Sequence, residues 1–467
     1  MTLQVHDNLT RQKWQFIPFK DGQVGMYVCG MTVQDKPHLG HMFSSVAGDM
    51  LRRYLEYMGF TVTYLYNFTD IDDKIIEKAK AESVNYQVIA LRNTEAYFAC
   101  ADLLNIKRAS IYPRATEHIP EILELIRKLE EKNLAYASGT DVYYNVSRFK
   151  SYGKLSGKKI DELRAGARVE VGESKRNPLD FCLWKGAKEG EPFWESPWGK
   201  GRPGWHIECS AMSMAYLGET FDIHGGGQDL IFPHHENEIA QSEGATGKPF
   251  VNFWVENGLV NLTSEKMSKS TRHFIAADEI LREFAPEAVR FYLLSNHYTS
   301  PIEFNEARLN EAGAALERLK NSMRRALELE ESEAGKKEIA KGAPILKTIG
   351  KTKELFHESM EDDFNSAKAI GHLFELGKEV NLSLERGGDA PAIGAAGRSL
   401  QELGAILGLF WKEERRDVPP EVIQLARERE LARDKKEWER ADSIRKSLFD
   451  QGFILEDHAG GTRIRRK

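Results

Sequence analysis

A strand–helix–strand pattern between residues 25 and 67 sets the fold class of this chain. Residues 25–29 form a short apolar run, and residues 61–67 are rich in the β-branched and aromatic residues that favour strands. Between them, apolar side chains recur at helical spacing, and Gly59 is placed to end that helix. The apolar positions are Phe43, Val46, Ala47, Met50, Leu51, Tyr54, Leu55 and Met58. The pattern predicts a βαβ unit, in which a right-handed crossover joins two parallel strands.

A second pattern of this kind lies much later in the sequence. Residues 221–224 are predicted to form a strand that leads into Gly225, Gly226 and Gly227 and then into a helix. Together the two patterns predict an α/β fold with a doubly wound parallel sheet whose halves are separated by a long insertion.

The rest of the chain divides by composition. Residues 308–410 are helical and strongly charged in pattern, and the Gly-, Ala- and Pro-rich stretch 386–397 is predicted to be a flexible link. The predicted segments are 1–114 (first half of the sheet domain), 115–200 (insertion), 201–260 (second half), 261–307 (a loop and the region after it), 308–410 (helical bundle) and 420–467 (small C-terminal domain).

Composition and charge exclude several classes of protein. With 41% hydrophobic and 29% charged residues, the chain has a globular composition, and no run is long and apolar enough to span a bilayer. The first eight residues lack the layout of a secretory signal. Four cysteines in 467 residues argue against a disulfide framework and favour the cytoplasm.

The charge of the chain does not favour nucleic-acid binding over its whole surface. The net charge is −6, yet residues 462–467 carry four positive charges. This basic tail is either solvated charge or a contact to phosphate, and both interpretations stay open.

Four potential zinc ligands occur at Cys29, Cys209, His234 and Glu238. His234 and Glu238 are four residues apart, so on a helix both side chains leave the same face. Two thiolates, an imidazole and a carboxylate make a donor set that zinc accepts. Taken singly, each cysteine could be apolar packing and the histidine a buried core residue. Together with the motifs below, the four predict a metal site.

The sequence His38-Leu39-Gly40-His41 falls between the first strand and the first helix, where doubly wound sheets bind nucleotides. Gly40 would let a ligand approach the backbone, and helix N-terminal amides favour anions. His38 and His41 could donate to phosphate oxygens. A turn with two incidental histidines is the alternative for so short a motif.

A second short motif, Lys266-Met267-Ser268-Lys269-Ser270, follows about 230 residues after the first. Two lysines and small hydroxyl residues suit a loop that covers a triphosphate and offsets the charge of the leaving pyrophosphate. A lysine-rich surface loop is the alternative interpretation.

These two motifs resemble the signature motifs of the class I aminoacyl-tRNA synthetases, and further segments resemble the cysteinyl-tRNA synthetase family in particular. They are Asn67–Lys74 (NFTDIDDK), Asn177–Phe181 (NPLDF), Gly204–Ser210 (GWHIECS), Phe232–Gln241 (FPHHENEIAQ) and Asp362–Asn365 (DDFN). The resemblance runs nearly end to end. It departs from the family pattern at Leu39, where HIGH becomes HLGH, and at Thr271-Arg272-His273, which replaces LGN after the lysine motif.

The resemblance implies a Rossmann-like catalytic domain that activates L-cysteine with ATP and transfers it to tRNA(Cys). It implies one Zn²⁺ per chain, held by the four ligands above, which binds the cysteine thiolate. It also implies an amino-acid pocket and an ATP site with Mg²⁺. The pocket residues are Gly30, Thr69, Trp205 and His224, and the ATP-binding residues are His38, Gly40, His41, Gly227, Asp229, Lys266 and Lys269, of which His38, His41, Lys266 and Lys269 are catalytic.

The resemblance further assigns roles to the C-terminal half. Residues 261–307 would hold the lysine motif and contact the tRNA stem, 308–410 would bind tRNA, and 420–467 would bind the anticodon. A monomer that does not associate with membranes is expected.

The zinc ion would explain how cysteine is distinguished from similar amino acids. Packing alone distinguishes side chains as similar as those of cysteine and serine by only about 1–3 kcal/mol. A thiolate is a better zinc ligand than a neutral hydroxyl, so metal ligation supplies selectivity without an editing domain. A four-ligand structural zinc is the alternative. For the whole chain, the alternative function is a cysteine-activating small-molecule ligase of the mycothiol type, which would not need residues 308–410 or the basic tail.

Overall fold

The computed structural model describes residues 2–159, 175–262, 275–332, 334–340, 342–411, 420–434, 437–458 and 461–466. These residues fall into two compact units, Met1–Phe410 and Trp411–Lys467. The finer division of the first unit stays a prediction. No helix within the described ranges combines the length and apolar character that crossing a membrane requires.

The centre of the first unit is a four-stranded parallel sheet with the strand order β10-β9-β3-β4. The prediction of a parallel sheet assembled from two distant parts of the sequence is confirmed. Its strands are β3 (Gln23–Val28), β4 (Thr61–Tyr66), β9 (Phe221–Gly227) and β10 (Val251–Asn257). Strand β9 runs through the three glycines, which the sequence placed after the strand.

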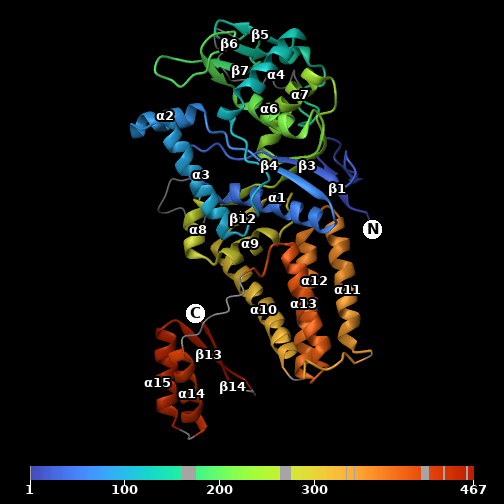
Figure 1. The fold of residues 1–467 in the computed structure, drawn as a ribbon, viewed down its shortest axis with the longest axis vertical. Coiled ribbons are helices and arrows are strands. Elements are labelled where there is room, and N and C mark those ends of the chain that lie inside the picture. The colour runs from blue at the N-terminus through green and yellow to red at the C-terminus, as the bar shows by residue number, and fades with distance from the viewer. Residues whose placement is uncertain are drawn as a thin grey trace. The chain divides into compact units, whose positions relative to one another are not determined.

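Helix α1 (Leu39–Tyr57) joins β3 to β4 and completes the predicted βαβ unit (Figure 1). The predicted apolar face is buried, apart from Met58 beyond its end, and Gly59 takes the left-handed φ of +94° that lets the chain turn away. Because β4 pairs with one side of β3 and β9 with the other, the carboxyl end of β3 is a topological switch point. Such points are where open α/β sheets bind ligands.

The insertion is a small antiparallel sheet backed by a helix. Its strands are β5 (Ala135–Ser138), β6 (Asp141–Tyr144), β7 (Phe181–Gly186) and β8 (Gly201–Pro203), in that order, and the helix is α4 (Ile119–Glu131). Its core includes Ile126 and Trp184 and continues into Ile207 of α6 (Trp205–Leu217) and Ala240 of α7 (Glu236–Thr246). The insertion therefore supports the two helices that carry two of the four predicted metal ligands, Cys209 and Glu238.

Short elements complete this part of the chain. A hairpin precedes the sheet, and two helices follow β4. Two further strands, which flank α8 and α9 in the sequence, pair with each other. These elements are β1 (Gln4–Asp7), β2 (Gln12–Gln15), α2 (Asp73–Glu82), α3 (Tyr86–Leu103), β11 (Val260–Leu262), α8 (Ala277–Glu283), α9 (Pro286–Leu294) and β12 (Ile302–Phe304). Single turns of other helix types span Ala115–Glu117, Val146–Arg148, Gln228–Leu230 and Ile231–His235.

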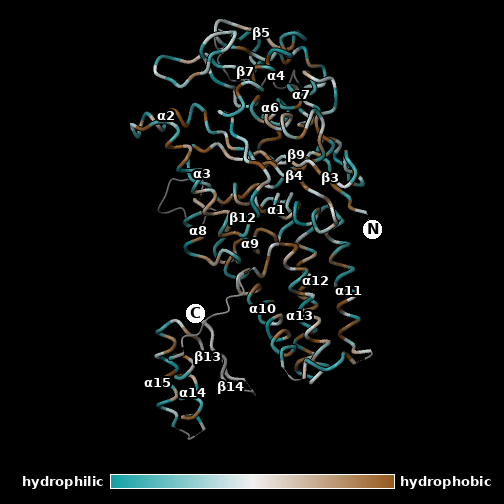
Figure 2. The backbone as a smooth tube through the Cα atoms, in the orientation of Figure 1, coloured by the Kyte–Doolittle hydropathy of each residue, from teal (hydrophilic) through white to brown (hydrophobic). Residues whose placement is uncertain are grey.

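Four helices form the bundle at the end of the first unit. They are α10 (Glu306–Glu331), α11 (Pro344–Glu361), α12 (Ser366–Glu385) and α13 (Ala390–Ile406). Each carries both hydrophilic and hydrophobic stretches (Figure 2), as expected when one face of a helix packs inward. The helical prediction for 308–410 is thus confirmed within the described residues.

The predicted flexible link at 386–397 is wrong for most of its length, because α13 begins at Ala390. The Asp389 carboxylate accepts a hydrogen bond from the Ala392 amide at 2.9 Å, which caps the helix. Its small residues allow close packing: a Cβ added at Gly397 would lie 2.9 Å from the Ala326 side chain of α10. A Gly- and Ala-rich stretch resembles a linker in sequence, and here it is a helix packed closely against its neighbour.

Substitution of the cap tests this helix start. Asp389→Ala is expected to lower the free energy of unfolding by about 1 kcal/mol, because the Ala392 amide loses its partner. Asp389→Asn, which can accept the same bond, is the matched control and should differ from the native protein by a few tenths of a kcal/mol. Urea unfolding followed by circular dichroism measures both. Equal losses in the two variants would contradict the capping role.

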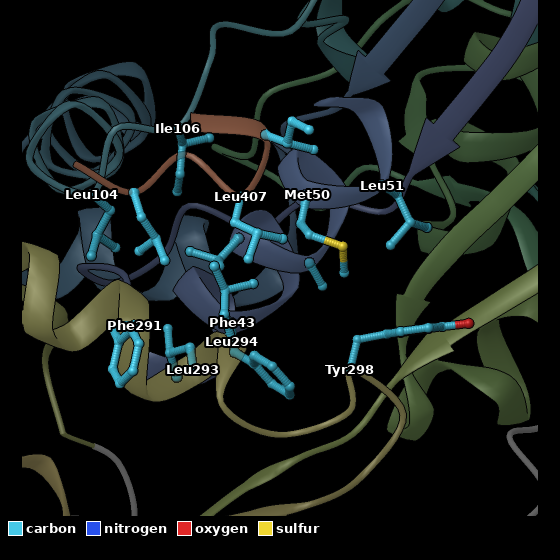
Figure 3. Packing of buried hydrophobic residues seen from close by; sticks show 14 of the residues in the cluster. Phe43, Met50, Leu51, Leu104, Ile106, Phe291, Leu293, Leu294, Tyr298 and Leu407 are labelled. Carbon is cyan, nitrogen blue, oxygen red and sulfur yellow. The ribbon is translucent and has the colours of Figure 1, made fainter. Parts of the chain in front are cut away.

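A buried ion pair connects α1 to α9 and the end of the bundle. The Arg290 and Asp49 side chains are fully buried, and Arg290 Nη2 donates to Asp49 Oδ2 at 2.6 Å. Arg290 also donates to the carbonyl oxygens of Leu407 and Leu104, both at 2.9 Å. Apolar side chains from the same three regions pack in one cluster (Figure 3), among them Phe43, Met50, Phe291, Leu294 and Leu407. The parallel sheet and the bundle thus share one core.

The described residues of the second unit form two helices and a hairpin: α14 (Pro420–Asp434), α15 (Trp438–Asp450), β13 (Phe453–His458) and β14 (Gly461–Arg466). Strand β14 pairs antiparallel with β13 and includes Arg463, Arg465 and Arg466. The basic residues described as a tail from the sequence therefore belong, up to Arg466, to a strand.

Candidate active site and metal centre

The four predicted metal ligands come together at the carboxyl end of β3. Cys29 directly follows β3, Cys209 lies on α6, His234 lies in the turn before α7, and Glu238 is on α7. One ligand atom from each lies within 4.8 Å of the others, and all four side chains are buried. We call these four residues the ligand cluster. The side chains of His234 and Glu238, four residues apart, lie side by side as their spacing predicts, with His234 Nε2 3.0 Å from Glu238 Oε1.

The two sulfur atoms and the carboxylate are in direct contact. Cys29 Sγ lies 3.8 Å from Cys209 Sγ and 3.4 Å from Glu238 Oε1. Burial raises the pKa of Cys209, but the hydrogen bond from Cys29 and the imidazole of His234 outweigh it, and the pKa falls to about 6. Burial and the neighbouring Cys209 raise the pKa of Cys29. In the ligand cluster without metal, Cys209 is the sulfur that ionises first.

The charged state of the other two ligands follows from their neighbours. Burial lowers the pKa of His234, but the Glu238 carboxylate and the Cys209 sulfur raise it to about 10. Burial raises the pKa of Glu238, but His224 and His234 hold it well below its usual range. Without metal, the cluster therefore holds a protonated imidazole beside a thiolate and a carboxylate, and a metal ion would take the place of that proton, because imidazole binds metal in its neutral form.

His224, predicted to line the amino-acid pocket, lies behind the ligand cluster. It is fully buried on β9, and its Nε2 is 2.9 Å from Glu238 Oε2, so it orients the carboxylate that faces His234. Among the described residues, a second group of four potential ligands also satisfies the 4.8 Å limit, namely Cys29, His224, His235 and Glu238. In that group His235 Nδ1 is paired with Glu256 Oε1 at 2.8 Å, and its Nε2 is buried without a hydrogen-bond partner among the described residues.

A cavity of about 420 Å³ opens beside the ligand cluster. We call it the active-site cavity. Its walls include eight residues predicted from the sequence: Cys29, Gly30, His38, Gly40, His41, Trp205, Gly227 and Asp229. Trp205 is 40% exposed, so it is a wall of this cavity and does not belong to the core. Thr69 and His224 are not part of its lining and lie behind it.

His38 and His41 accept hydrogen bonds from each other's backbone amides. His38 caps α1: its Nδ1 accepts from the His41 amide, and His41 Nδ1 accepts from the His38 amide, both at 3.2 Å. Burial lowers the pKa of His38 to about 4, and burial followed by the charge of His38 lowers that of His41 further. Both rings are therefore neutral at pH 7. Because each Nδ1 accepts, the ring proton is on Nε2 in both.

Gly30 is required where two backbone segments touch. A Cβ at this position would lie 1.7 Å from the Asn67 carbonyl oxygen, and the Gly30 amide donates to Asn67 Oδ1 at 2.8 Å. The segment that follows Asn67 pairs with the cavity wall, since the Thr69 amide donates to the Met31 carbonyl oxygen. Thr69 is buried, and its hydroxyl donates to Glu208 Oε2 at 2.9 Å.

Sequence reasoning missed several residues of this site. Ser44, Lys74 and Asn257 line the active-site cavity, and Glu208 contacts Thr69. Ser44 lies three residues after His41 on α1, so helical spacing offered a signal for it. Lys74 follows the Asp72 cap of α2 and lies within the quoted NFTDIDDK segment, where it was not singled out. Asn257 and Glu208 carried no signal beyond their polarity.

The predicted lysine motif lies outside the described residues. Lys266 and Lys269 fall within 263–274, and Asn261 and Ile275, on either side of that stretch, both line the active-site cavity. The role assigned to the two lysines stays a prediction.

Comparison with known proteins finds aminoacyl-tRNA synthetases as relatives over nearly the whole chain. Residues 15–314 match the family model of the tRNA synthetases class I (C) catalytic domain, and residues 355–411 match the DALR domain. A cysteine–tRNA ligase of Geobacter sulfurreducens is 47% identical over 99% of both chains. One of Carboxydothermus hydrogenoformans is 48% identical over 99% of this chain and all of its own.

Solved structures share the fold at low sequence identity. Mycobacterium tuberculosis methionyl-tRNA synthetase in complex with methionyl-adenylate has a TM-score of 0.63 at 16% identity, covering 82% of this chain and 90% of its own. A leucyl-tRNA synthetase from Agrobacterium radiobacter has a TM-score of 0.59 at 12% identity, covering 85% and 86%. With a class I catalytic domain, a DALR domain and full-length relatives of one kind, the chain belongs to the cysteine–tRNA ligases, the cysteinyl-tRNA synthetases of class I.

Proposed function

We propose that this chain activates L-cysteine with ATP in the active-site cavity, selects it through a zinc ion held by Cys29, Cys209, His234 and Glu238, and transfers it to tRNA(Cys). The observation that carries the proposal is the position of the ligand cluster. Four buried donors lie within 4.8 Å of one another, and one of them, Cys29, is also a wall of the cavity that His38 and His41 line.

The residues of the ligand cluster fit zinc. Two sulfur atoms, one imidazole and one carboxylate are ordinary zinc donors, and the low pKa of Cys209 supplies a thiolate near neutral pH. The second group offers a single sulfur, whereas the ligand cluster offers two, and thiolates are the donors that favour zinc over harder cations. A bound zinc would accept the substrate thiolate as a further ligand and so favour cysteine over serine.

The cavity residues supply positioning and charge stabilisation for adenylate formation. The cysteine carboxylate attacks the α-phosphate of ATP, and pyrophosphate leaves. The neutral rings of His38 and His41 carry their protons on Nε2, which makes them hydrogen-bond donors to phosphate oxygens. Gly40 leaves space beside them, Gly227 and Asp229 meet the ribose, and Lys266 and Lys269, with Mg²⁺, offset the pyrophosphate charge.

The tRNA-binding parts are proposed to follow the predicted segments. Residues 308–410 would bind tRNA and 420–467 the anticodon, in a monomer. This is supported by the DALR match and by relatives that share both regions. A mycothiol-type ligase would not need them. The four free cysteines favour action in the reducing cytoplasm.

A charging assay with cysteine and serine side by side tests the proposed function. The purified protein, tRNA(Cys) and ATP should yield aminoacylated tRNA with cysteine, and the kcat/KM for serine should be lower by more than the roughly 200-fold that packing alone can supply. Cysteine-dependent ATP–pyrophosphate exchange without charging would point to the small-molecule ligase. Equal use of serine would contradict selection by the metal.

A further inference from the structure

We infer that Asp363, in the DDFN segment, is a positioning residue for the nucleotide. It fixes residues 297–302, which we call the connecting segment, and these fix the wall of the active-site cavity formed by residues 257–261. The inference rests on the proposed function and deepens it. It gives a role in ATP binding to a motif to which the proposed function assigns none.

The backbone at Asp363 is unusual. Asp363 follows helix α11 and is 3% exposed, and its φ is +61°. The next residue, Phe364, also has a left-handed φ, of +52°. Left-handed backbone costs free energy in residues other than glycine, and it persists where the surrounding contacts fix it. Two such residues in succession therefore indicate that the contacts of this turn outweigh its strain.

The Asp363 carboxylate contacts two segments from other parts of the first unit. Its Oδ1 accepts from the Tyr298 hydroxyl and from the His6 amide, both at 2.9 Å. Its Oδ2 lies 3.6 Å from His297 Nε2. Burial lowers the pKa of His297, so this ring is neutral at pH 7 and the contact is not an ion pair. Because Tyr298 and His297 begin the connecting segment, Asp363 fixes this segment from the end of a bundle helix.

The backbone of the connecting segment is bonded to the cavity wall. The Tyr298 carbonyl oxygen accepts from the Gly258 amide, and the Ile302 amide donates to the Leu259 carbonyl oxygen, both at 2.8 Å. Gly258 and Leu259 line the active-site cavity. A Cβ added at Gly258 would lie 2.2 Å from the Ser300 carbonyl oxygen, so the two backbones are in direct contact. A displacement of the connecting segment would therefore move this wall.

The connecting segment also reaches a second part of the cavity wall. Gln228 Nε2 donates to the Thr299 carbonyl oxygen at 3.0 Å. Gln228 lies between Gly227 and Asp229, which both line the cavity and are proposed to meet the ribose. Thr299 is itself fixed by His297, whose Nδ1 is 2.8 Å from the Thr299 hydroxyl. The contacts that begin at Asp363 therefore extend to two parts of the wall.

These contacts belong to the nucleotide side of the cavity. Besides the proposed ribose residues, they involve residues 257–261, which lead towards the stretch 263–274 that contains the two motif lysines. Within the described ranges, the hydrogen bonds of the connecting segment include none to the ligand cluster, which is proposed to bind the substrate sulfur. A displaced wall should therefore weaken ATP binding and leave cysteine binding unaffected.

Tyr298→Phe removes the hydroxyl that bonds to Asp363 and keeps the ring. We expect ATP affinity to fall about tenfold, close to the upper limit for the loss of one ordinary hydrogen bond, and L-cysteine affinity to change less than about twofold. Isothermal titration calorimetry of the full-length, zinc-loaded protein with each ligand separately measures both affinities. Equal losses for the two ligands, or an unchanged ATP affinity, would overturn the inference.

Tyr136→Phe is the matched control, because it removes another buried hydrogen bond between a tyrosine and an aspartate. The Tyr136 hydroxyl, on β5 of the insertion, donates to Asp180 Oδ2 at 2.8 Å, and Tyr136 is not among the described residues that line the active-site cavity. Urea unfolding should show similar losses of stability in the two variants, and only Tyr298→Phe should lose ATP affinity. A purely structural bond at Tyr298 would instead leave the two variants alike in both measurements.

Two substitutions of Asp363 itself complete the test. Asp363→Asn keeps an oxygen that can accept from both Tyr298 and His6, and asparagine suits left-handed backbone, so ATP affinity should stay within about twofold of the native value. Asp363→Ala removes the acceptor and should reproduce the selective loss of ATP affinity. If Asp363→Ala does not fold, Tyr298→Phe still decides. A loss in Asp363→Asn as large as in Tyr298→Phe would contradict the role of the acceptor oxygen.

The titration with ATP needs neither cysteine nor tRNA, so it tests the inference separately from the proposed function. Native protein that binds ATP but shows no cysteine-dependent pyrophosphate exchange would contradict the proposed function. The ATP affinity of Tyr298→Phe would then still decide whether Asp363 positions the nucleotide wall.

Discussion

Replacement of Cys209 by serine is expected to lower kcat/KM for cysteine-dependent ATP–pyrophosphate exchange about a thousandfold, equivalent to about 4 kcal/mol of transition-state stabilisation. Cys209 is the sulfur of the ligand cluster that ionises first, and a serine hydroxyl does not ionise near neutral pH. The variant should lose zinc and cysteine affinity together. ATP affinity should change less than about twofold, because the residues proposed to bind ATP do not include Cys209.

The matched control is Cys182→Ser, the same substitution at a free cysteine in strand β7 of the insertion. It should retain zinc and exchange activity. If Cys209→Ser also retained zinc and cysteine affinity, the ligand assignment would be wrong. The group of Cys29, His224, His235 and Glu238 would then become the candidate to test by the same means.

Arg290→Met is expected to lower the free energy of unfolding of the first unit by about 3–5 kcal/mol, the usual cost of breaking a buried ion pair. The substitution removes the donor to Asp49 and leaves the carbonyl oxygens of Leu407 and Leu104 without that partner. Asp49 would retain its bonds from Arg53 Nε at 2.7 Å and from the Lys107 amide at 2.9 Å. Urea unfolding followed by tryptophan fluorescence, to which the buried Trp184 and Trp254 contribute, measures the change.

Arg282→Met is the control for this substitution, because Arg282 makes an exposed ion pair with Asp278 on the neighbouring helix α8. Exposed pairs of this kind contribute about 0–1 kcal/mol. Similar losses of unfolding free energy in the two variants would mean that the Arg290–Asp49 pair stabilises the fold no more than an exposed ion pair does. A large loss for Arg290→Met alone would establish it as a structural connection.

The sequence predicted those parts of the fold and site that depend on local pattern. The βαβ unit follows from helical and strand periodicity, and the helix between its strands occupies the expected residues. The ligand cluster follows from residue chemistry, since few other roles would need Cys29, Cys209, His234 and Glu238 in such motifs. Their proximity in the structure agrees with this reasoning.

Features that arise from tertiary packing could not be predicted in this way. The stretch 390–397 has the composition of a linker, and it is helical because its small side chains let α13 approach α10. The mutual capping that fixes the protons of His38 and His41 depends on backbone geometry at the start of α1. The burial of Glu208 against Thr69 joins residues far apart in the chain, and nothing in either neighbourhood indicates the contact.

The Arg290 connection also limits how this enzyme can be shortened. Helix α1, which begins directly after His38, is connected through Asp49 to the Arg290 side chain. The other acceptors of Arg290 include the carbonyl oxygen of Leu407, at the end of the fourth bundle helix. A truncation that removed the bundle would leave a buried guanidinium without one of its acceptors, at the base of the catalytic domain. Gene fusions, minimised variants and fragment complementation should therefore be cut after Phe410, where the first unit ends.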